Sequence, residues 1–187
     1  MPSDAADNLS EDAWAQRCTA GLAGGVRSAY EALFVARCAL VEAEAARRLG
    51  RRRDLVDDVA QETWLRVARG PRRCGSAVSL DAWLRTIVRS AAIDTLRSEL
   101  ARRCREQSVS RAEATTFVED VELLETLRCE GASALGLTSE EQWMLELRVR
   151  TGATMEQLAG LIGIGRSALD SKLRRAAERA RAQRMTS

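Results

Sequence analysis

Basic and hydroxyl-bearing side chains recur near the carboxy-terminal end of this 187-residue chain, on a helix predicted to begin at Arg166 and end near Ala182. Leu169 and Leu173 form its apolar face. Its candidate binding residues are Arg166, Ser167, Asp170, Ser171, Lys172, Arg174 and Arg175. Arginine can bridge the acceptors of guanine or bind phosphate, and aspartate can accept from cytosine N4. These residue types predict a surface that binds nucleic acid.

The segment before this helix supports the same interpretation. Residues 154–157 (TMEQ) fit a capping box, which predicts a short helix that ends at Ile162. Residues 163–165 (GIG) then predict a tight turn. A short helix, a glycine turn and a longer basic helix are typical of a helix-turn-helix, whose second helix enters the major groove of DNA. Plain helical bundles also contain this order, so the pattern alone leaves both interpretations open.

The residue types that are missing exclude much enzyme chemistry. The chain has no histidine, so it lacks imidazole general bases, Ser/His and Cys/His nucleophile systems and Cys/His zinc sites. Its five cysteines include no CxxC pair, and reduced thiols are expected. We predict no catalytic residue, no metal ligand and no cofactor.

Hydropathy and charge indicate where the protein works. Residues 1–12 are acidic and polar, unlike a secretory signal, and no run of about 18 apolar residues occurs. A cytoplasmic protein without direct membrane insertion is predicted.

Two basic segments, 61–107 and 148–187, flank the acidic segment 108–147. Two separate surfaces for polyanions are therefore indicated, although a single charge run is usually only a solvated face.

The composition predicts an all-α fold, because alanine, leucine, arginine and glutamate are abundant while aromatic residues make up 4% of the chain. We predict two small helical domains, 1–104 and 118–187, joined by a linker at 105–117. In the first domain, one predicted helix begins at Ser10, two cover 26–49 and 54–69, and a fourth is capped by Ser79 and ends near residue 103. In the second domain, a short acidic helix is predicted at 118–130, and the next helix begins after a capping box at Thr138 and ends near Arg150. Asp94 falls in an apolar sector of its helix and needs a partner that the sequence does not identify.

Three blocks resemble the extracytoplasmic-function (ECF) sigma factors, the small two-domain branch of the bacterial sigma-70-type family. DDVAQETWLRV at 57–67 and LDAWLRTIVRSAAIDTLR at 80–97 resemble the two helices of the family's region two, and residues 137–181 resemble its region four. The resemblance implies a helical transcription initiation factor without catalytic activity. It would bind core RNA polymerase through the β′ clamp and the β flap, and would direct the enzyme to promoter DNA.

The resemblance also implies roles for particular residues. The polymerase-binding set on the 54–69 helix would be Asp57, Asp58, Gln61 and Glu62. The loop at 70–79 would capture a base flipped from the minus-ten element, since a pocket must offset the few kcal/mol of unstacking. The minus-ten set would be Arg72, Arg73, Ser76, Arg85, Arg89, Ser90 and Arg97. The helix that starts at Arg166 would read the minus-thirty-five element, and an anti-sigma factor is a further implied partner.

The departures from the family pattern concern promoter choice. Arg85 stands where an aromatic residue is common, Ser90 where asparagine is common, and Asp170 where lysine or arginine is common. The promoter sequence is therefore not predicted. The sequence leaves three alternatives: a dimeric helix-turn-helix regulator, a sigma mimic that sequesters a partner, and a metal enzyme that uses Asp57, Asp58 and Glu62. The last lacks histidine and any phosphate-binding loop.

Overall fold

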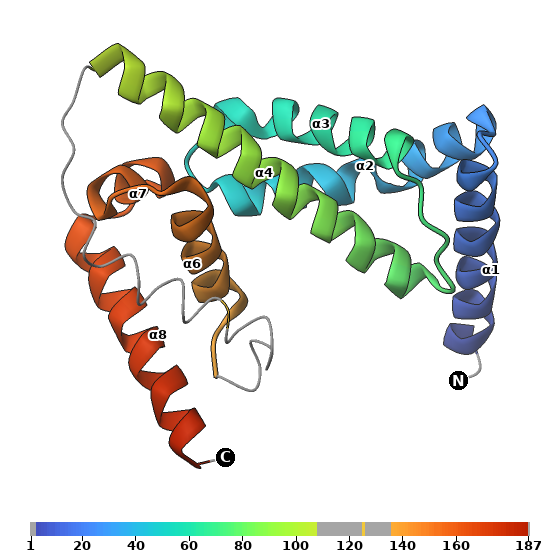
Figure 1. The fold of residues 1–187 in the computed structure, drawn as a ribbon. Coiled ribbons are helices and arrows are strands. Elements are labelled where there is room, and N and C mark those ends of the chain that lie inside the picture. The colour runs from blue at the N-terminus through green and yellow to red at the C-terminus, as the bar shows by residue number, and fades with distance from the viewer. Residues whose placement is uncertain (1–2, 108–124, 126–135, 187) are drawn as a thin grey trace. The chain divides into compact units, whose positions relative to one another are not determined.

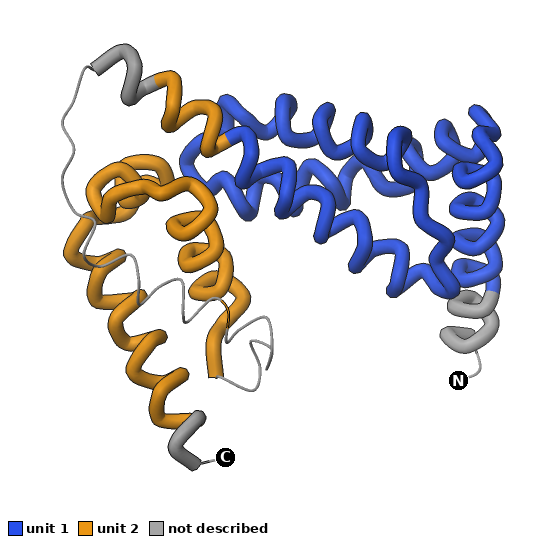
Figure 2. Tube along the Cα trace, in the orientation of Figure 1, with its two compact units in different colours: residues 1–95 blue, residues 96–187 orange. Residues whose placement is uncertain are grey.

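The structure, a computed structural model, describes residues 3–107, 125 and 136–186, and every regular element in those ranges is a helix. The predicted all-α fold is therefore confirmed. The chain divides into two compact units, residues 1–95 and 96–187 (Figure 2). Residues 105–107, predicted to begin the linker, are helical, and the rest of the predicted linker and almost all of the predicted helix at 118–130 lie outside the described residues.

The first unit is formed by helices that are joined by short connections (Figure 1). They are α1 (Ser3–Ala23), α2 (Arg27–Leu49), the short 3-10 helix η1 (Arg53–Leu55), α3 (Val56–Arg69) and the first part of α4 (Ala77–Gln107). Helix α2 packs against both α1 and α3. A Cβ atom at Gly21 would lie 2.6 Å from the Cβ of Ala29, so glycine is needed where α1 approaches α2.

Two predicted helix starts were wrong. Helix α1 begins at Ser3 rather than Ser10, because residues 4–9 contain neither glycine nor proline and continue the helix. Helix α4 begins at Ala77, and Ser76 rather than Ser79 is its cap. The Ser76 Oγ accepts from the Ser79 amide at 3.1 Å, and the Ser79 Oγ accepts from the Ser76 amide at 3.1 Å. The two serines form a reciprocal cap in which Ser79 is the returning partner.

The core of the first unit follows the helical period of the sequence. All four α-helices of this unit contribute fully buried side chains, and those of α2, α3 and α4 include Leu33, Val41, Leu49, Val59, Val67, Leu80, Leu84, Val88 and Ile93. The recurrence at three or four residues within each helix places one stripe of each against the others. The opposite faces are left for polar and basic side chains.

Asp94 has the partner that its position required. The Arg66 Nη2 donates to Asp94 Oδ2 at 3.0 Å, its Nη1 donates to Ser90 Oγ at 3.1 Å, and its Nε donates to Glu62 Oε1 at 2.7 Å. Burial lowers the pKa of Arg66, but the hydrogen bonds to Glu62 and Asp94 outweigh it and hold the pKa above its usual value. One guanidinium thus joins α3 to α4.

The described part of the second unit contains the end of α4, from residue 96, together with α6 (Ser139–Thr151), α7 (Met155–Ile162) and α8 (Arg166–Thr186). Both predicted capping boxes are confirmed, at Thr138 with Glu141 and at Thr154 with Gln157. The predicted turn is also confirmed: Gly163 has a φ of 79°, and its amide donates to the Ala159 carbonyl at 2.8 Å. The buried core here includes Leu145, Leu147, Leu158, Leu161, Leu169 and Leu173.

Glu141 joins the start of α6 to α8, and we expect its loss to destabilise the second unit. Burial raises the pKa of Glu141, but hydrogen bonds from Arg179 and Thr138 outweigh it and hold the pKa below its usual value. The stability that the Glu141 carboxylate contributes is therefore fully present above the ordinary pKa of glutamate. It is lost as the pH falls through the lowered pKa of Glu141 in the folded protein. Glu141→Gln should cost about 1–2 kcal/mol at pH 7. Thermal unfolding of both proteins should show this difference at pH 7 and a shrinking difference in acid, and a constant difference would contradict it.

Candidate functional site

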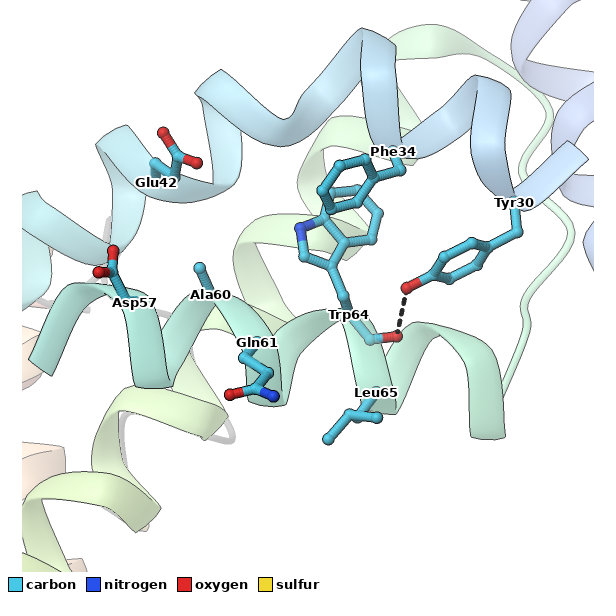
Figure 3. A pocket seen from close by; sticks show the side chains of 8 residues that line it. All are labelled: Tyr30, Phe34, Glu42, Asp57, Ala60, Gln61, Trp64 and Leu65. Carbon is cyan, nitrogen blue, oxygen red and sulfur yellow. Dashed lines mark hydrogen bonds between the residues drawn. The ribbon is translucent and has the colours of Figure 1, made fainter.

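A groove opens along α2 and α3 (Figure 3). Its volume is about 420 Å³, and its lining residues come from both helices: Tyr30, Phe34, Glu42, Asp57, Ala60, Gln61, Trp64 and Leu65. A groove of this volume, open to solvent between two packed helices, can accept apolar side chains of another helix.

Three aromatic rings contribute to the apolar part of the groove. Trp64 is only 6% exposed, and its ring centroid lies 5.0 Å from that of Phe34 and 6.0 Å from that of Tyr30. The Tyr30 hydroxyl donates to the Trp64 carbonyl at 3.3 Å (Figure 3), and burial raises the pKa of Tyr30. The rings are thus held in place, while Phe34 and Leu65 remain 42% and 43% exposed. Exposed side chains of this size beside a groove are typical of a protein-binding surface.

Polar groups lie on the rim of the same groove. Glu42 comes from α2, and Asp57 and Gln61 come from α3; all three are exposed. The two carboxylates can accept from lysine or arginine side chains, and the Gln61 amide can both donate and accept. The groove is therefore suited to a partner helix that carries apolar residues flanked by basic ones.

The structure divides the four predicted polymerase-binding residues. Asp57 and Gln61 line the groove. Asp58 is exposed on α3 but is not among the lining residues. Glu62 is half-buried and forms an ion pair with Arg66, 2.7 Å long, on the side of α3 that faces α4. Sequence reasoning missed the α2 residues Tyr30, Phe34 and Glu42, although the one-turn spacing of Tyr30 and Phe34 was a usable signal.

The loop between α3 and α4 carries three of the predicted minus-ten residues. Arg72 and Arg73 are exposed, so both guanidinium groups face solvent. Ser76 instead caps α4 through its hydrogen bonds with Ser79. A base or phosphate that meets this loop would therefore meet the two arginines first.

The remaining predicted minus-ten residues lie on α4. Arg85 and Arg97 are exposed, and Arg89 is half-buried. Ser90 accepts a hydrogen bond from Arg66 and so contributes to the junction of α3 and α4. The exposed arginines form the basic part of this helix surface, and Ser90 has a structural partner.

The predicted set on α8 lies mainly on its outer face. The exposed members are Arg166, Ser167, Asp170, Arg174 and Arg175, whereas Ser171 and Lys172 are half-buried. The Lys172 Nζ lies 2.7 Å from Glu140 Oε2, and the Arg175 Nε donates to the Ser171 carbonyl at 3.1 Å. Arg174 lies 4.0 Å from Glu178, at the limit of an ion pair. The Arg174 guanidinium is thus only weakly held and is available to a ligand.

The described part of the chain offers neither a metal site nor a membrane span. No group of three cysteine, aspartate or glutamate side chains there could hold a metal ion. None of the helices there has an apolar stretch long enough to traverse a bilayer.

Comparison with known proteins gives one family. Residues 39–102 match the family model described as Sigma-70 region 2. The matched segment begins within α2, includes all of α3 and contains most of the groove lining. The match supports a member of the sigma-70 family and suggests a role in RNA polymerase binding and promoter melting. No curated protein and no solved structure matches the chain.

Proposed function

We propose that this protein is a sigma factor of the extracytoplasmic-function type, which binds core RNA polymerase and directs it to particular promoters. The observation that carries the proposal is the coincidence of the Sigma-70 region 2 match with the groove between α2 and α3. The protein would act by binding and would catalyse no reaction itself. The proposed domains are 1–104 and 118–187.

The groove supplies the polymerase-binding part of the proposal. Its aromatic rings would receive apolar side chains of a helix in the β′ clamp, and Asp57 and Glu42 would pair with basic residues of that helix. An anti-sigma factor that covers the same rings would compete with the polymerase. Co-purification of the chain with core polymerase, an inhibitor or both would identify which of these partners the protein binds.

The first proposed domain, 1–104, would also read the minus-ten element. Arg72 and Arg73 are exposed on the loop before α4, where a guanidinium plane can stack on a flipped base or bind phosphate. Arg85, Arg89 and Arg97 would bind the same strand. Ser90 is less suited to this role, because Arg66 already engages its hydroxyl.

Helices α7 and α8 would act as a helix-turn-helix that reads the minus-thirty-five element, with α8 in the major groove. The exposed arginines on α8 favour this role over a mimic that merely sequesters a partner, since a mimic has no need of them. The β flap is the proposed polymerase contact of this domain.

The deciding experiment is run-off transcription with purified core polymerase and a pool of genomic promoter fragments. The protein alone should bind duplex DNA weakly, because its two reading surfaces lie on separate units and need the polymerase to fix their separation. With core enzyme it should yield discrete transcripts. Transcription at background level on every template would refute the proposal.

Opposite changes on α8 should have opposite effects on DNA binding. Arg174→Ala should weaken the binding of promoters that depend on a minus-thirty-five element by about 1–3 kcal/mol if Arg174 contacts a base. Asp170→Lys should raise general affinity and steepen the salt dependence, because it removes phosphate repulsion and adds a cation. Promoter binding by the holoenzyme at several salt concentrations measures both effects. An unchanged salt slope for Asp170→Lys would contradict this role of Asp170.

A further inference from the structure

Helix α1 holds the loop that precedes α4 through hydrogen bonds from one stripe of side chains. The Thr19 Oγ1 accepts from the Cys74 amide at 3.1 Å, the Gln16 Nε2 donates to the Gly75 carbonyl at 2.7 Å, and the Asp12 Oδ1 accepts from the Ala77 amide at 2.7 Å. Asp12, Gln16 and Thr19 follow one another at about one turn of α1. Three side chains thus fix the backbone of an almost continuous segment, 74–77, and the loop lies beside α1 (Figure 1).

The geometry at Thr19 and Cys74 is the most constrained part of this contact. Thr19 is fully buried, and its hydroxyl donates to the Ala15 carbonyl at 2.8 Å. That bond orients the hydroxyl oxygen so that its lone pair can accept from Cys74. The Cys74 side chain is also buried. A buried hydroxyl satisfied in this way holds one backbone position of the loop in a single place.

Helix α1 is itself fixed, so it can act as a support. The Arg37 Nη2 lies 2.6 Å from Glu11 Oε1 on α1, and its Nε lies 2.8 Å from Asp81 Oδ1 on α4. The same guanidinium lies 5.0 Å from the ring centroid of Trp14 on α1. The Arg37 side chain of α2 therefore joins α1 to the start of α4. These are the two elements that the loop contacts or leads into, so both are fixed relative to each other.

The opposite side of the loop is open. Arg72 and Arg73 are exposed, and Val78 in the first turn of α4 is 78% exposed. The loop thus combines a backbone that α1 fixes with outward side chains that can pair, stack or wedge against a base. A flipped base tolerates little displacement of the groups that receive it, because lost contacts no longer offset the cost of unstacking.

We infer that Asp12, Gln16 and Thr19 are positioning residues that determine which minus-ten base the loop accepts. They act through the backbone at 74–77 and contact no nucleic acid themselves. The inference rests on the proposed sigma function. Because all three precede residue 39, they lie outside the segment that matches the family model.

The test compares matched variants of the full chain in the holoenzyme. Thr19→Val keeps the shape of the side chain but removes the hydroxyl, and Thr19→Ser restores it. Gln16→Ala removes an exposed donor, so it spares the fold, and Arg17→Ala is the matched exposed control on α1. Permanganate reactivity on a promoter library with randomised minus-ten bases reports which sequences open. Core-polymerase affinity and the melting temperature are measured alongside.

Thr19→Val and Gln16→Ala should each change the ratio of openings between preferred and disfavoured bases by at least about fivefold. Core affinity should stay within about twofold, and Thr19→Ser and Arg17→Ala should keep the parent profile. An unchanged base profile for Gln16→Ala overturns the inference. The inference is also overturned if the variants lose opening equally on all promoters and bind core polymerase more weakly. If the parent protein itself opens no promoter with core enzyme, the proposed function fails, which is a different result.

Discussion

Replacing Asp57 by arginine and Leu65 by aspartate should abolish the binding of core RNA polymerase while leaving the fold intact. Both side chains are exposed, and both line the groove between α2 and α3. Asp57→Arg replaces an acceptor for basic partner residues by a like charge. Leu65→Asp puts a carboxylate where an apolar side chain of the partner would pack. Burying this carboxylate away from water would be costly.

The expected loss of affinity is more than about 100-fold, since central interface residues commonly contribute 2 kcal/mol or more each. Fluorescence anisotropy of the labelled protein with purified core enzyme measures it. Transcription should fall equally at every promoter, because docking precedes promoter choice. Val35→Asp is the matched control: Val35 is 76% exposed on α2 and does not line the groove. Affinities of the double variant and the parent that agree within a few-fold would show that the polymerase docks elsewhere.

The helix boundaries that could be predicted are those set by local signals. The boxes at Thr138 and Thr154 each bring a hydroxyl and a carboxylate or amide within three residues, so the sequence contains the whole motif. Gly50, with a φ of 57°, ends α2 for an equally local reason. The start of α4 was missed because Ser76 and Ser79 can each cap a helix, and their reciprocal bonds decide between them.

The groove was only half predictable, because it is made by contacts between distant residues. Tyr30 and Trp64 are 34 residues apart in the chain, yet their rings meet edge to face. Periodicity indicated which face of α3 is apolar and which is polar. It could not show that α2 leaves Phe34 exposed beside Trp64. The partner of Asp94 was hidden for the same reason, since Arg66 lies 28 residues away.

Glu62 and Asp58 lie one turn apart on α3, and the sequence alone gives them the same role, but their substitutions should differ sharply. Glu62→Arg should lower the free energy of unfolding by about 2–4 kcal/mol, because it removes a charged hydrogen bond and sets a second guanidinium against Arg66. Asp58→Arg should cost no more than about 1 kcal/mol, the typical loss of one acid from the first turn of a helix. Urea unfolding followed by circular dichroism gives both values.

The expected difference follows from the position of Arg66, which also binds Asp94 and Ser90 on α4. A guanidinium repelled by residue 62 would no longer donate to those two groups and would loosen the junction of α3 with α4. Glu62→Gln is the control, because it keeps an acceptor for the Arg66 Nε and should lose less than Glu62→Arg. Equal stability of the two arginine variants would show that the ion pair contributes nothing. If the two variants differ in stability, a protein with the charges of both Asp58 and Glu62 reversed would be impaired in folding as well as in docking. Asp57 and Leu65 are therefore the proper probes of the polymerase-binding surface.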